Sequence, residues 1–178
     1  MSAVPNPLLF LITGSRGAGK TTFCRAMVQS AREAGWQVAG LLSNPIFTGS
    51  TRTSIIAEDL HGGERRILAT RSDQPTPGSR VWQFDPSAVT WSNQVLQLAT
   101  PCDLLVVDEL GPIEFEQGQG WQLGLTAVDS KQYAIALVVI RTELLGEALI
   151  RWGEANLVEI DTPEDSTWKA QKLSKQLF

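Results

Sequence analysis

The chain has 178 residues, of which 43% are hydrophobic and 19% charged, and its formal net charge is −4 at pH 7. This composition is typical of one soluble globular domain and excludes disordered and collagen-like chains. The longest apolar run, residues 134–140, is far shorter than the ~20 residues of a membrane-spanning helix. The negative charge argues against general binding to nucleic acid or to an anionic membrane, so we expect neither as a partner.

The cysteines and the N-terminal residues predict a cytoplasmic location. Cys24 and Cys102 form no CxxC pair and are too few for a disulfide framework, which fits a reducing compartment. The first residues show neither a basic segment before the apolar stretch nor a cleavage-site pattern, so we expect no signal peptide.

The chain begins with a predicted strand, a glycine-rich loop and a helix. Residues 8–12 are all apolar and too few for a helix, so they predict a strand that is buried on both faces. After the loop at residues 14–19, apolar residues recur at helical spacing until Gly35, which suits a left-handed C-cap. Residues 38–42 predict the next strand.

Residues 43–84 differ from the rest of the chain and predict a β-rich insertion. Residues 53–60 and 65–70 are β-prone and flank a glycine pair, which predicts an antiparallel hairpin, and residues 80–84 predict a short strand. The segment has too few apolar residues for a core of its own, so we expect a single domain over residues 1–178. Turn signals occur at Asn44-Pro45, Thr48-Gly49-Ser50, His61-Gly62-Gly63, and the loop containing Pro75, Pro77 and Gly78.

Helices and strands alternate again from Asp85 onward, which predicts an α/β fold with a largely parallel sheet. The expected elements are a helix from Pro86 that ends before Pro101, a strand over 103–108, a helix over 115–130, a strand over 133–140, a helix over 142–152, a strand over 157–160 and a helix over 163–177.

The loop at residues 14–21 reads Gly-Ser-Arg-Gly-Ala-Gly-Lys-Thr and matches G-x-x-x-x-G-K-[ST], the pattern of a phosphate-binding loop. Glycines let the backbone wrap phosphate oxygens and point N–H groups at them, and the following helix adds the positive end of its dipole. Lys20 supplies a charge for the β- and γ-phosphates, and the Thr21 hydroxyl is a ligand suited to Mg²⁺. We therefore expect a nucleoside triphosphate, ATP or GTP, to contact Gly14, Ser15, Arg16, Gly17, Ala18, Gly19, Lys20, Thr21 and Thr22. The Arg16 side chain either contacts the nucleotide or stays in solvent.

A second motif supplies the carboxylates that such a loop needs. Residues 104–109 read Leu-Leu-Val-Val-Asp-Glu, a buried strand that carries two acids to the ligand-binding edge of the sheet. Asp108 is the expected Mg²⁺ ligand, and Glu109 is the carboxylate expected to orient a water for attack on the γ-phosphorus. The alternative is a solvated strand end without chemistry.

An acid directly after the metal-binding aspartate is typical of phosphate-loop ATPases with an extra strand between the loop strand and the aspartate strand. Residues 133–140 are the candidate for that strand, and Arg141 after it would lie near the γ-phosphate as a catalytic charge stabiliser. The alternative is a surface arginine that starts a helix. The expected fold is thus the three-layer α/β fold of P-loop NTPases, RecA/ASCE-like, with a mainly parallel sheet and an inserted antiparallel β-hairpin.

Together these motifs resemble the cancer-related nucleoside-triphosphatase family (the THEP type) over nearly the whole chain. The most specific part is Asp108-Glu-Leu-Gly-Pro-Ile-Glu114, which is similar to the family's Asp-Glu-Ile-Gly-x-Met-Glu. The resemblance implies slow, Mg²⁺-dependent hydrolysis of ATP, GTP and other nucleoside triphosphates to the diphosphate and phosphate. Two departures are the missing histidine of the family's His-Arg pair near Arg141, and Ser15-Arg16 where prolines are common.

Three other functions stay open at this point. Asp108-x-x-Gly111 superficially matches a GTPase switch, but no Asn-Lys-x-Asp or Thr-Lys-x-Asp follows to select guanine. A small-molecule or nucleotide kinase suits the size, although its arginine-rich lid usually follows the aspartate strand. An ATP-responsive accessory module of a larger assembly, with a protein partner that the sequence does not identify, would have no use for Glu109.

Several weaker candidates have two readings each. Glu114 either supports the metal or the attacking water, or is an acid stabilised at a helix N-terminus. Arg65 and Arg66 either protect a strand edge or form a lid over the nucleotide. Most of the six tryptophans are expected to pack in the core or at an interface, and one could stack on the base.

Overall fold

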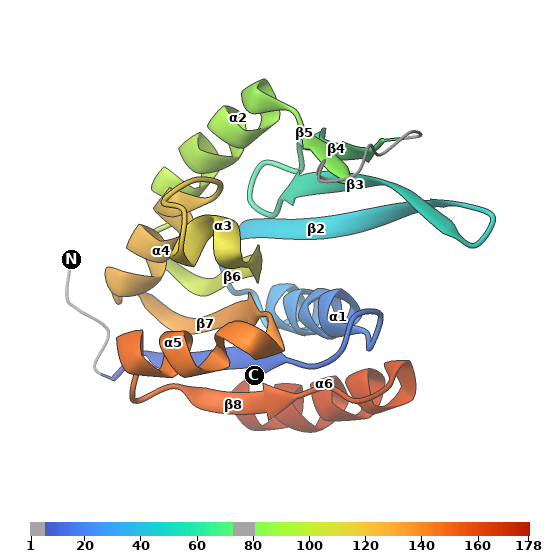
Figure 1. The fold of residues 1–178 in the computed structure, drawn as a ribbon. Coiled ribbons are helices and arrows are strands. Elements are labelled where there is room, and N and C mark those ends of the chain that lie inside the picture. Colours follow the sequence, from blue (N-terminus) through green and yellow to red (C-terminus); the bar gives the residue numbers. More distant parts are fainter. Residues whose placement is uncertain (1–5, 73–80) are drawn as a thin grey trace.

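The computed structural model describes residues 6–72 and 81–178, which form an eight-stranded sheet with helices on both faces (Figure 1). The strands are β1 (Leu8–Thr13), β2 (Val38–Thr48), β3 (Thr51–Asp59), β4 (Arg65–Arg71), β5 (Trp82–Phe84), β6 (Cys102–Leu110), β7 (Tyr133–Ile140) and β8 (Asn156–Glu159). The helices are α1 (Lys20–Glu33), α2 (Pro86–Gln97), α3 (Pro112–Phe115), α4 (Gln122–Asp129), the 3₁₀ turn η1 (Thr142–Leu144), α5 (Leu145–Arg151) and α6 (Pro163–Leu177).

The order of the strands brings the predicted motifs to one edge of the sheet. The order is β5-β4-β3-β2-β6-β7-β1-β8, and the strands from β2 to β8 in this order are parallel. Strand β7 lies between β1 and β6, so the predicted middle strand at residues 133–140 is confirmed. Because these strands are parallel, the residues that follow β1, β6 and β7 meet at their common C-terminal edge.

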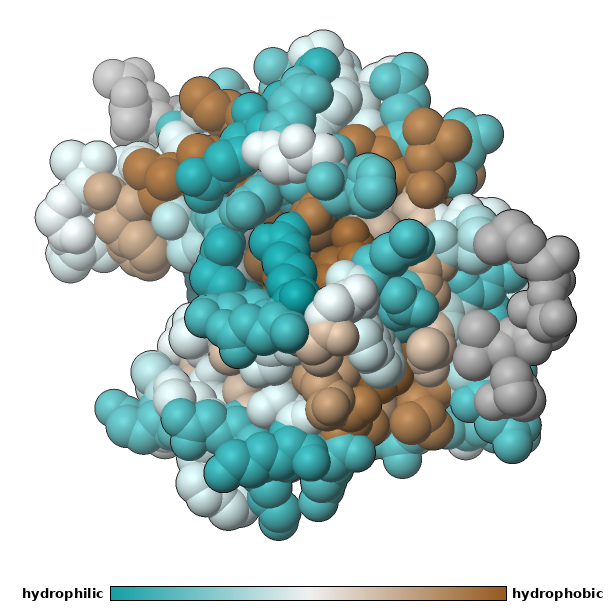
Figure 2. Space-filling model, turned by 180° about the vertical axis from the view of Figure 1, so that it is seen from behind, coloured by the Kyte–Doolittle hydropathy of each residue, from teal (hydrophilic) through white to brown (hydrophobic). Residues whose placement is uncertain are grey.

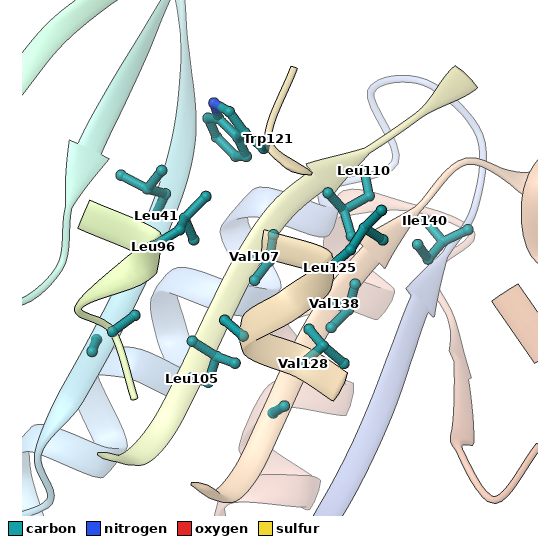
Figure 3. Close-up of a cluster of buried hydrophobic side chains, with 14 of the residues drawn as sticks. Leu41, Leu96, Leu105, Val107, Leu110, Trp121, Leu125, Val128, Val138 and Ile140 are labelled. Atoms are coloured by element: carbon teal, nitrogen blue, oxygen red, sulfur yellow. The ribbon is translucent and has the colours of Figure 1, made fainter. Parts of the chain in front are cut away.

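Both faces of the central strands are buried, which explains their uninterrupted apolar sequences. On β6, Leu104 and Val106 belong to the core under α1 and α6, whereas Leu105 and Val107 belong to the core under α2, α4 and α5. Figure 3 shows the second core, with Leu125 of α4 packed over β6 and β7. The α/β prediction with a largely parallel sheet is therefore confirmed.

The insertion extends the sheet from β2 with antiparallel strands. Strands β3 and β4 form the predicted hairpin, and β5 pairs with β4. The expected turn at Asn44-Pro45 is wrong, because β2 continues through both residues and pairs with β3 as far as Thr48. Beyond Leu41 the strand β2 no longer pairs with β6, so Pro45 lies where a missing N–H is tolerated. The expected loop at Pro75, Pro77 and Gly78, and the start of the strand predicted over 80–84, lie outside the described residues.

The helix expected over residues 115–130 is also wrong in its extent. The segment forms the short helix α3 and the separate helix α4, with Gly118 and Gly120 between them at φ of 62° and 70°. These left-handed conformations cannot continue an α-helix, and they turn the chain between the two. Within the described ranges, no helix is both long and apolar enough to cross a membrane.

Gly40 sets how closely β2 approaches β6, and we expect its replacement by alanine to destabilise the fold. Gly40 has a φ of 104°, and a Cβ there would overlap the carbonyl oxygen of Val106. Gly40→Ala should lower the free energy of unfolding by about 2–3 kcal/mol, measured by urea denaturation. The matched control is Gly146→Ala on α5, where a Cβ would meet no described atom within 4 Å. This control should be neutral or stabilise by up to about 1 kcal/mol, and equal effects of the two variants would contradict the argument.

Candidate functional site

The loop between β1 and α1 takes its shape from three glycines. Gly14, Gly17 and Gly19 have φ of 136°, 83° and 101°, where other residues are strained. A Cβ on Gly14 would overlap the carbonyl of Ile160, so the loop starts in close contact with the segment after β8. Gly19 is the N-cap of α1, and within the described chain this helix end has neither a side-chain cap nor an acid in its first turn. Its first N–H groups are therefore suited to bind an anion.

Lys20 lies folded into the loop. Its Nζ donates hydrogen bonds to the carbonyl oxygens of Gly14 at 2.8 Å and Ser15 at 2.9 Å. An ammonium group carries three donors, so these two bonds leave one N–H for a phosphate oxygen. The other residues of the loop differ in exposure: Ala18 is buried, Gly14, Gly19 and Thr21 are partly buried, and Ser15, Arg16, Gly17 and Thr22 are exposed.

Asp108 carries a buried carboxyl group at the end of the apolar part of β6. The residue is 1% exposed, and the Ser43 N–H donates to its Oδ2 at 3.1 Å. Burial raises the pKa of Asp108 from 3.8 to about 7, although hydrogen bonds from Thr21 and Ser43 act in the opposite direction. The Ser43 hydroxyl also donates to the Asp108 backbone carbonyl. The carboxyl group is thus held in place by β2 and α1, but its charge is only partly compensated.

The Thr21 hydroxyl and the Asp108 carboxylate are the residues that could hold a metal ion. Their hydrogen bond places one hydroxyl and one carboxylate side by side at the start of α1. Oxygen ligands of this kind suit Mg²⁺, which usually takes its other ligands from phosphates and water. A divalent cation would also stabilise the ionised carboxylate that burial disfavours. The donor set therefore fits Mg²⁺.

Glu109 lies at a β-bulge in β6, where the regular pairing with β7 is interrupted. Asp108 pairs with Val139 and Leu110 with Ile140, so Glu109 is an extra residue opposite β7. Such bulges redirect a side chain, and they are common beside functional sites. The Glu109 side chain is 34% exposed, which leaves its carboxylate accessible to water.

Arg141 lies beside Glu109, directly after β7. Its Nε donates to Glu109 Oε1 at 2.6 Å. Burial alone would lower the pKa of Arg141, but the hydrogen bond and charge of Glu109 outweigh it and raise that pKa. The next residue, Thr142, shares a hydrogen bond of 3.3 Å with Thr13 at the end of β1. The segment after β7 is thereby attached to the strand that leads into the loop.

Glu114 organises the segment between α3 and α4. Its carboxylate accepts hydrogen bonds from the N–H of Gly111 at 2.8 Å and of Trp121 at 3.0 Å. Burial raises the pKa of Glu114 despite these two bonds. This geometry matches one of the two interpretations of Glu114, an acid at a helix N-terminus. The same carboxylate also binds the N–H group at the start of α4.

The structure adds two residues to the site that the sequence analysis missed. Ser43 follows the buried part of β2, next to the strand that carries Asp108, so the rule that parallel strand ends meet could have found it. Arg52 on β3 interacts electrostatically with Arg16, Glu109, Asp108 and Arg141. No local motif marks Arg52, since only the pairing of the hairpin brings it there.

The weaker candidates have other partners. Arg65 forms an ion pair with Glu58 at 3.5 Å, and Arg66 pairs with Glu64 at 2.7 Å and lies over the Trp91 ring. Both arginines therefore have partners within or next to the insertion. Among the tryptophans, Trp91, Trp121 and Trp152 are buried, as expected of core residues.

The raised pKa of Asp108 predicts how stability depends on pH when nucleotide and metal are absent. Between about pH 4 and pH 7 the folded protein holds a proton that the unfolded chain has lost, so stability falls as the pH rises through this window. Asp108→Asn removes the buried charge. The variant should therefore melt higher than the unmodified protein at about pH 8, by about 2–4 °C for each kcal/mol gained.

The difference should shrink at about pH 5, where Asp108 is protonated in the folded protein. Asp161→Asn is the control, because Asp161 is 70% exposed and should show no such pH-dependent gain. If Asp108→Asn melts lower than the unmodified protein at both pH values, the carboxyl group is not an uncompensated buried charge.

Comparisons with known proteins identify the family. A family model described as NTPase matches residues 9–164. Nucleoside-triphosphatase THEP1 of Ignicoccus hospitalis is 31% identical over 160 residues, which cover 89% of this chain and 91% of that protein. Nucleoside-triphosphatase THEP1 of Metallosphaera sedula is 31% identical over 134 residues, which cover 75% of this chain and 72% of the relative.

Solved structures share the fold. The solution structure of a human cancer-related nucleoside triphosphatase superposes with a TM-score of 0.70 at 22% identity, over 96% of this chain and 97% of that one. The crystal structure of THEP1 from the hyperthermophile Aquifex aeolicus gives a TM-score of 0.64 at 17% identity, over 96% and 99%. The expected P-loop NTPase fold and the family resemblance are confirmed. The chain belongs to the NTPase family, the family of the THEP1 nucleoside-triphosphatases, which are hydrolases.

Proposed function

We propose that this chain hydrolyses nucleoside triphosphates, including ATP and GTP, to the diphosphate and phosphate with Mg²⁺ as cofactor. The position of Glu109 carries the proposal. Its carboxylate follows Asp108 directly, remains partly exposed, and pairs with Arg141 at 2.6 Å. An acid and a cation therefore lie together at the sheet edge that also carries the glycine loop.

The glycine loop supplies the hydrogen-bond donors that bind the triphosphate in this proposal. The N–H groups at the start of α1 and the Lys20 ammonium are the donors for the β- and γ-phosphate oxygens. Two of the three ammonium donors are held by loop carbonyls, which orients the third. The loop thus fixes the position of the phosphate chain before any chemistry takes place.

Thr21 and Asp108 would hold Mg²⁺ in this scheme, as their oxygen ligands and buried geometry allow. When bound, Mg²⁺ neutralises charge on the phosphate oxygens. Ser43 has a supporting role, since its N–H fixes one carboxylate oxygen of Asp108 and leaves the other for the metal.

Glu109 and Arg141 perform the chemical step in our proposal. The Glu109 carboxylate accepts a hydrogen bond from a water molecule and orients its oxygen toward the γ-phosphorus. The new P–O bond forms as one water proton passes to the Glu109 carboxylate, while the bond to the bridging oxygen breaks and the diphosphate leaves. Arg141 bonds Glu109 through Nε, so its Nη groups can donate to the γ-phosphate, where negative charge must be stabilised.

The same observations argue against the alternative functions. A kinase lid built from Arg65 and Arg66 finds no support, because both are engaged by Glu58 and Glu64. A pure binding module has no use for a partly exposed acid at the position of Glu109. We also propose a cytoplasmic location, because both cysteines are free thiols and burial raises the pKa of each.

Glu109→Gln tests the proposal by separating binding from turnover. The amide keeps the size of the side chain but cannot act as a base, so kcat should fall by about 10²- to 10⁴-fold while nucleotide affinity is retained. Lys20→Ala should weaken binding of the triphosphate itself. The measurement is phosphate release from ATP, GTP, CTP and UTP, with and without Mg²⁺ and without any acceptor, together with calorimetric affinities.

Glu116→Gln is the matched control, since Glu116 is exposed at the end of α3 and should leave activity unchanged. An unmodified protein that releases no phosphate from any of the four nucleotides would exclude the proposed activity. A Glu109→Gln variant with unmodified turnover would exclude the role of this carboxylate.

A further inference from the structure

Arg52 belongs to β3 of the β2–β3 hairpin, and the proposed mechanism assigns a role to Ser43 of β2 but to no residue of β3. It is the second residue of β3 and pairs with Phe47 of β2 close to the turn. The hairpin extends past the parallel strands on the side where the loop between β1 and α1 lies (Figure 1). Seen from behind, it projects over an open notch on that side of the molecule (Figure 2). The hairpin can therefore present a side chain to a ligand on the loop.

The Arg52 guanidinium lies against an aromatic ring and has one buried N–H without a partner in the described part of the chain. It lies over the Trp82 ring, with 5.4 Å between its Cζ and the ring centroid. Its Nε is buried, and among the residues that the structure describes it has no hydrogen-bond partner. A buried N–H of a charged group is costly to leave unpaired, so such donors normally face a partner. Trp82 therefore contacts the guanidinium without accepting a hydrogen bond from it.

Arg52 also lies in the electrostatic field of the proposed active site. Burial lowers the pKa of Arg52, the nearby cations Arg16 and Arg141 lower it further, and Glu109 and Asp108 oppose this effect. The charges of Arg16, Arg141, Asp108 and Glu109 thus all act on Arg52, and Arg141 also contacts Glu109 directly. Of these arginines, Arg141 has a carboxylate partner, whereas no described acid lies within ion-pair distance of Arg16 or Arg52. This excess of positive charge suits a polyanion.

We propose that Arg52 binds the terminal phosphate of the nucleoside triphosphate from the side of the hairpin, opposite the glycine loop. The inference rests on the proposed function and assigns one further phosphate-binding residue to the same site. A guanidinium presents several donors in one plane and can contact two phosphate oxygens at once. Bound phosphate would pair with the Arg52 guanidinium and offset the repulsion from Arg16 and Arg141.

The assignment to the terminal phosphate follows from the neighbours of Arg52. Glu109 and Arg141 act at the γ-phosphate in the proposed mechanism, and both interact with Arg52. The β-phosphate, in contrast, is bound by the loop and by Lys20. Arg52 should therefore help to distinguish a triphosphate from a diphosphate, because a diphosphate leaves the guanidinium without a partner.

Arg52→Gln and Arg52→Lys test this inference by calorimetry with Mg²⁺ and either a nonhydrolysable ATP analogue or ADP. Arg52→Gln should weaken binding of the triphosphate analogue by about 10-fold or more and change the affinity for ADP by less than about 2-fold. Arg52→Lys keeps the charge and loses the planar donors, so its triphosphate affinity should be intermediate. If Arg52→Gln does not fold, Arg52→Lys tests the inference through the same comparison of triphosphate-analogue affinity with ADP affinity.

A melting experiment separates this role from simple packing. Without nucleotide, Arg52→Gln should melt at the same temperature as the unmodified protein or higher, because it removes a repelled cation. The matched control is Arg66→Gln, since Arg66 also lies over a tryptophan ring, at 4.9 Å, but is away from the site. It should bind both nucleotides like the unmodified protein.

Two outcomes would overturn the inference: an unchanged triphosphate affinity in Arg52→Gln, with or without a lower melting temperature, or an equal loss of affinity for ADP. If the unmodified protein hydrolyses triphosphates and Lys20→Ala loses binding, these outcomes remove only the role of Arg52. If the unmodified protein neither binds nor hydrolyses any triphosphate, the proposed function fails as well.

Discussion

The site depends on a carboxyl group that is buried at the end of an apolar strand. Desolvation opposes the charge of Asp108, and two hydrogen bonds from Ser43 and Thr21 compensate only part of this cost. Such a group is retained where a cation completes its environment, as a metal ion on a triphosphate would. Strand β2 lies on one side of β6 and β7 on the other, and each neighbour adds a group to this edge: Ser43 from β2 and Arg141 after β7.

A second feature is the crowding of cations around that edge. Repulsion between like charges that lie close together destabilises the free protein, and a bound anion offsets this repulsion. Glu109 neutralises one of these cations through its bond to Arg141, so the two residues that we propose for the chemical step form one ion pair. Its effect on stability is expected to be small, since both side chains are partly exposed. The Glu109–Arg141 ion pair instead fixes the positions of the two side chains relative to each other.

Much of this arrangement can be predicted from local sequence. The glycine loop needs its residue types at fixed spacing, and Asp108-Glu109 ends an apolar run, so both were found without a structure. The position of β7 followed from the acid after the aspartate. These features depend on neighbouring residues along the chain, or on the rule that parallel strand ends share an edge.

The parts that sequence did not predict depend on distant pairing. Strand β2 continues through Asn44-Pro45 because β3 supplies a partner, and in isolation this dipeptide is a turn signal. Arg52 reaches the site only through that longer hairpin. Glu114 had two local interpretations, and its hydrogen bonds to Gly111 and Trp121 form because the chain turns between α3 and α4 instead of continuing as one helix.

The contact between α6 and the glycine loop has a consequence for biosynthesis. Ser166 Oγ donates to the Gly19 carbonyl oxygen at 2.8 Å across 147 residues of sequence, and a Cβ on Gly19 would press against the same serine. The loop leaves the ribosome long before this helix does. A nascent chain therefore carries the glycine motif well before it can form the contact with α6. The support from Ser166 reaches the loop only after all eight strands have been synthesised.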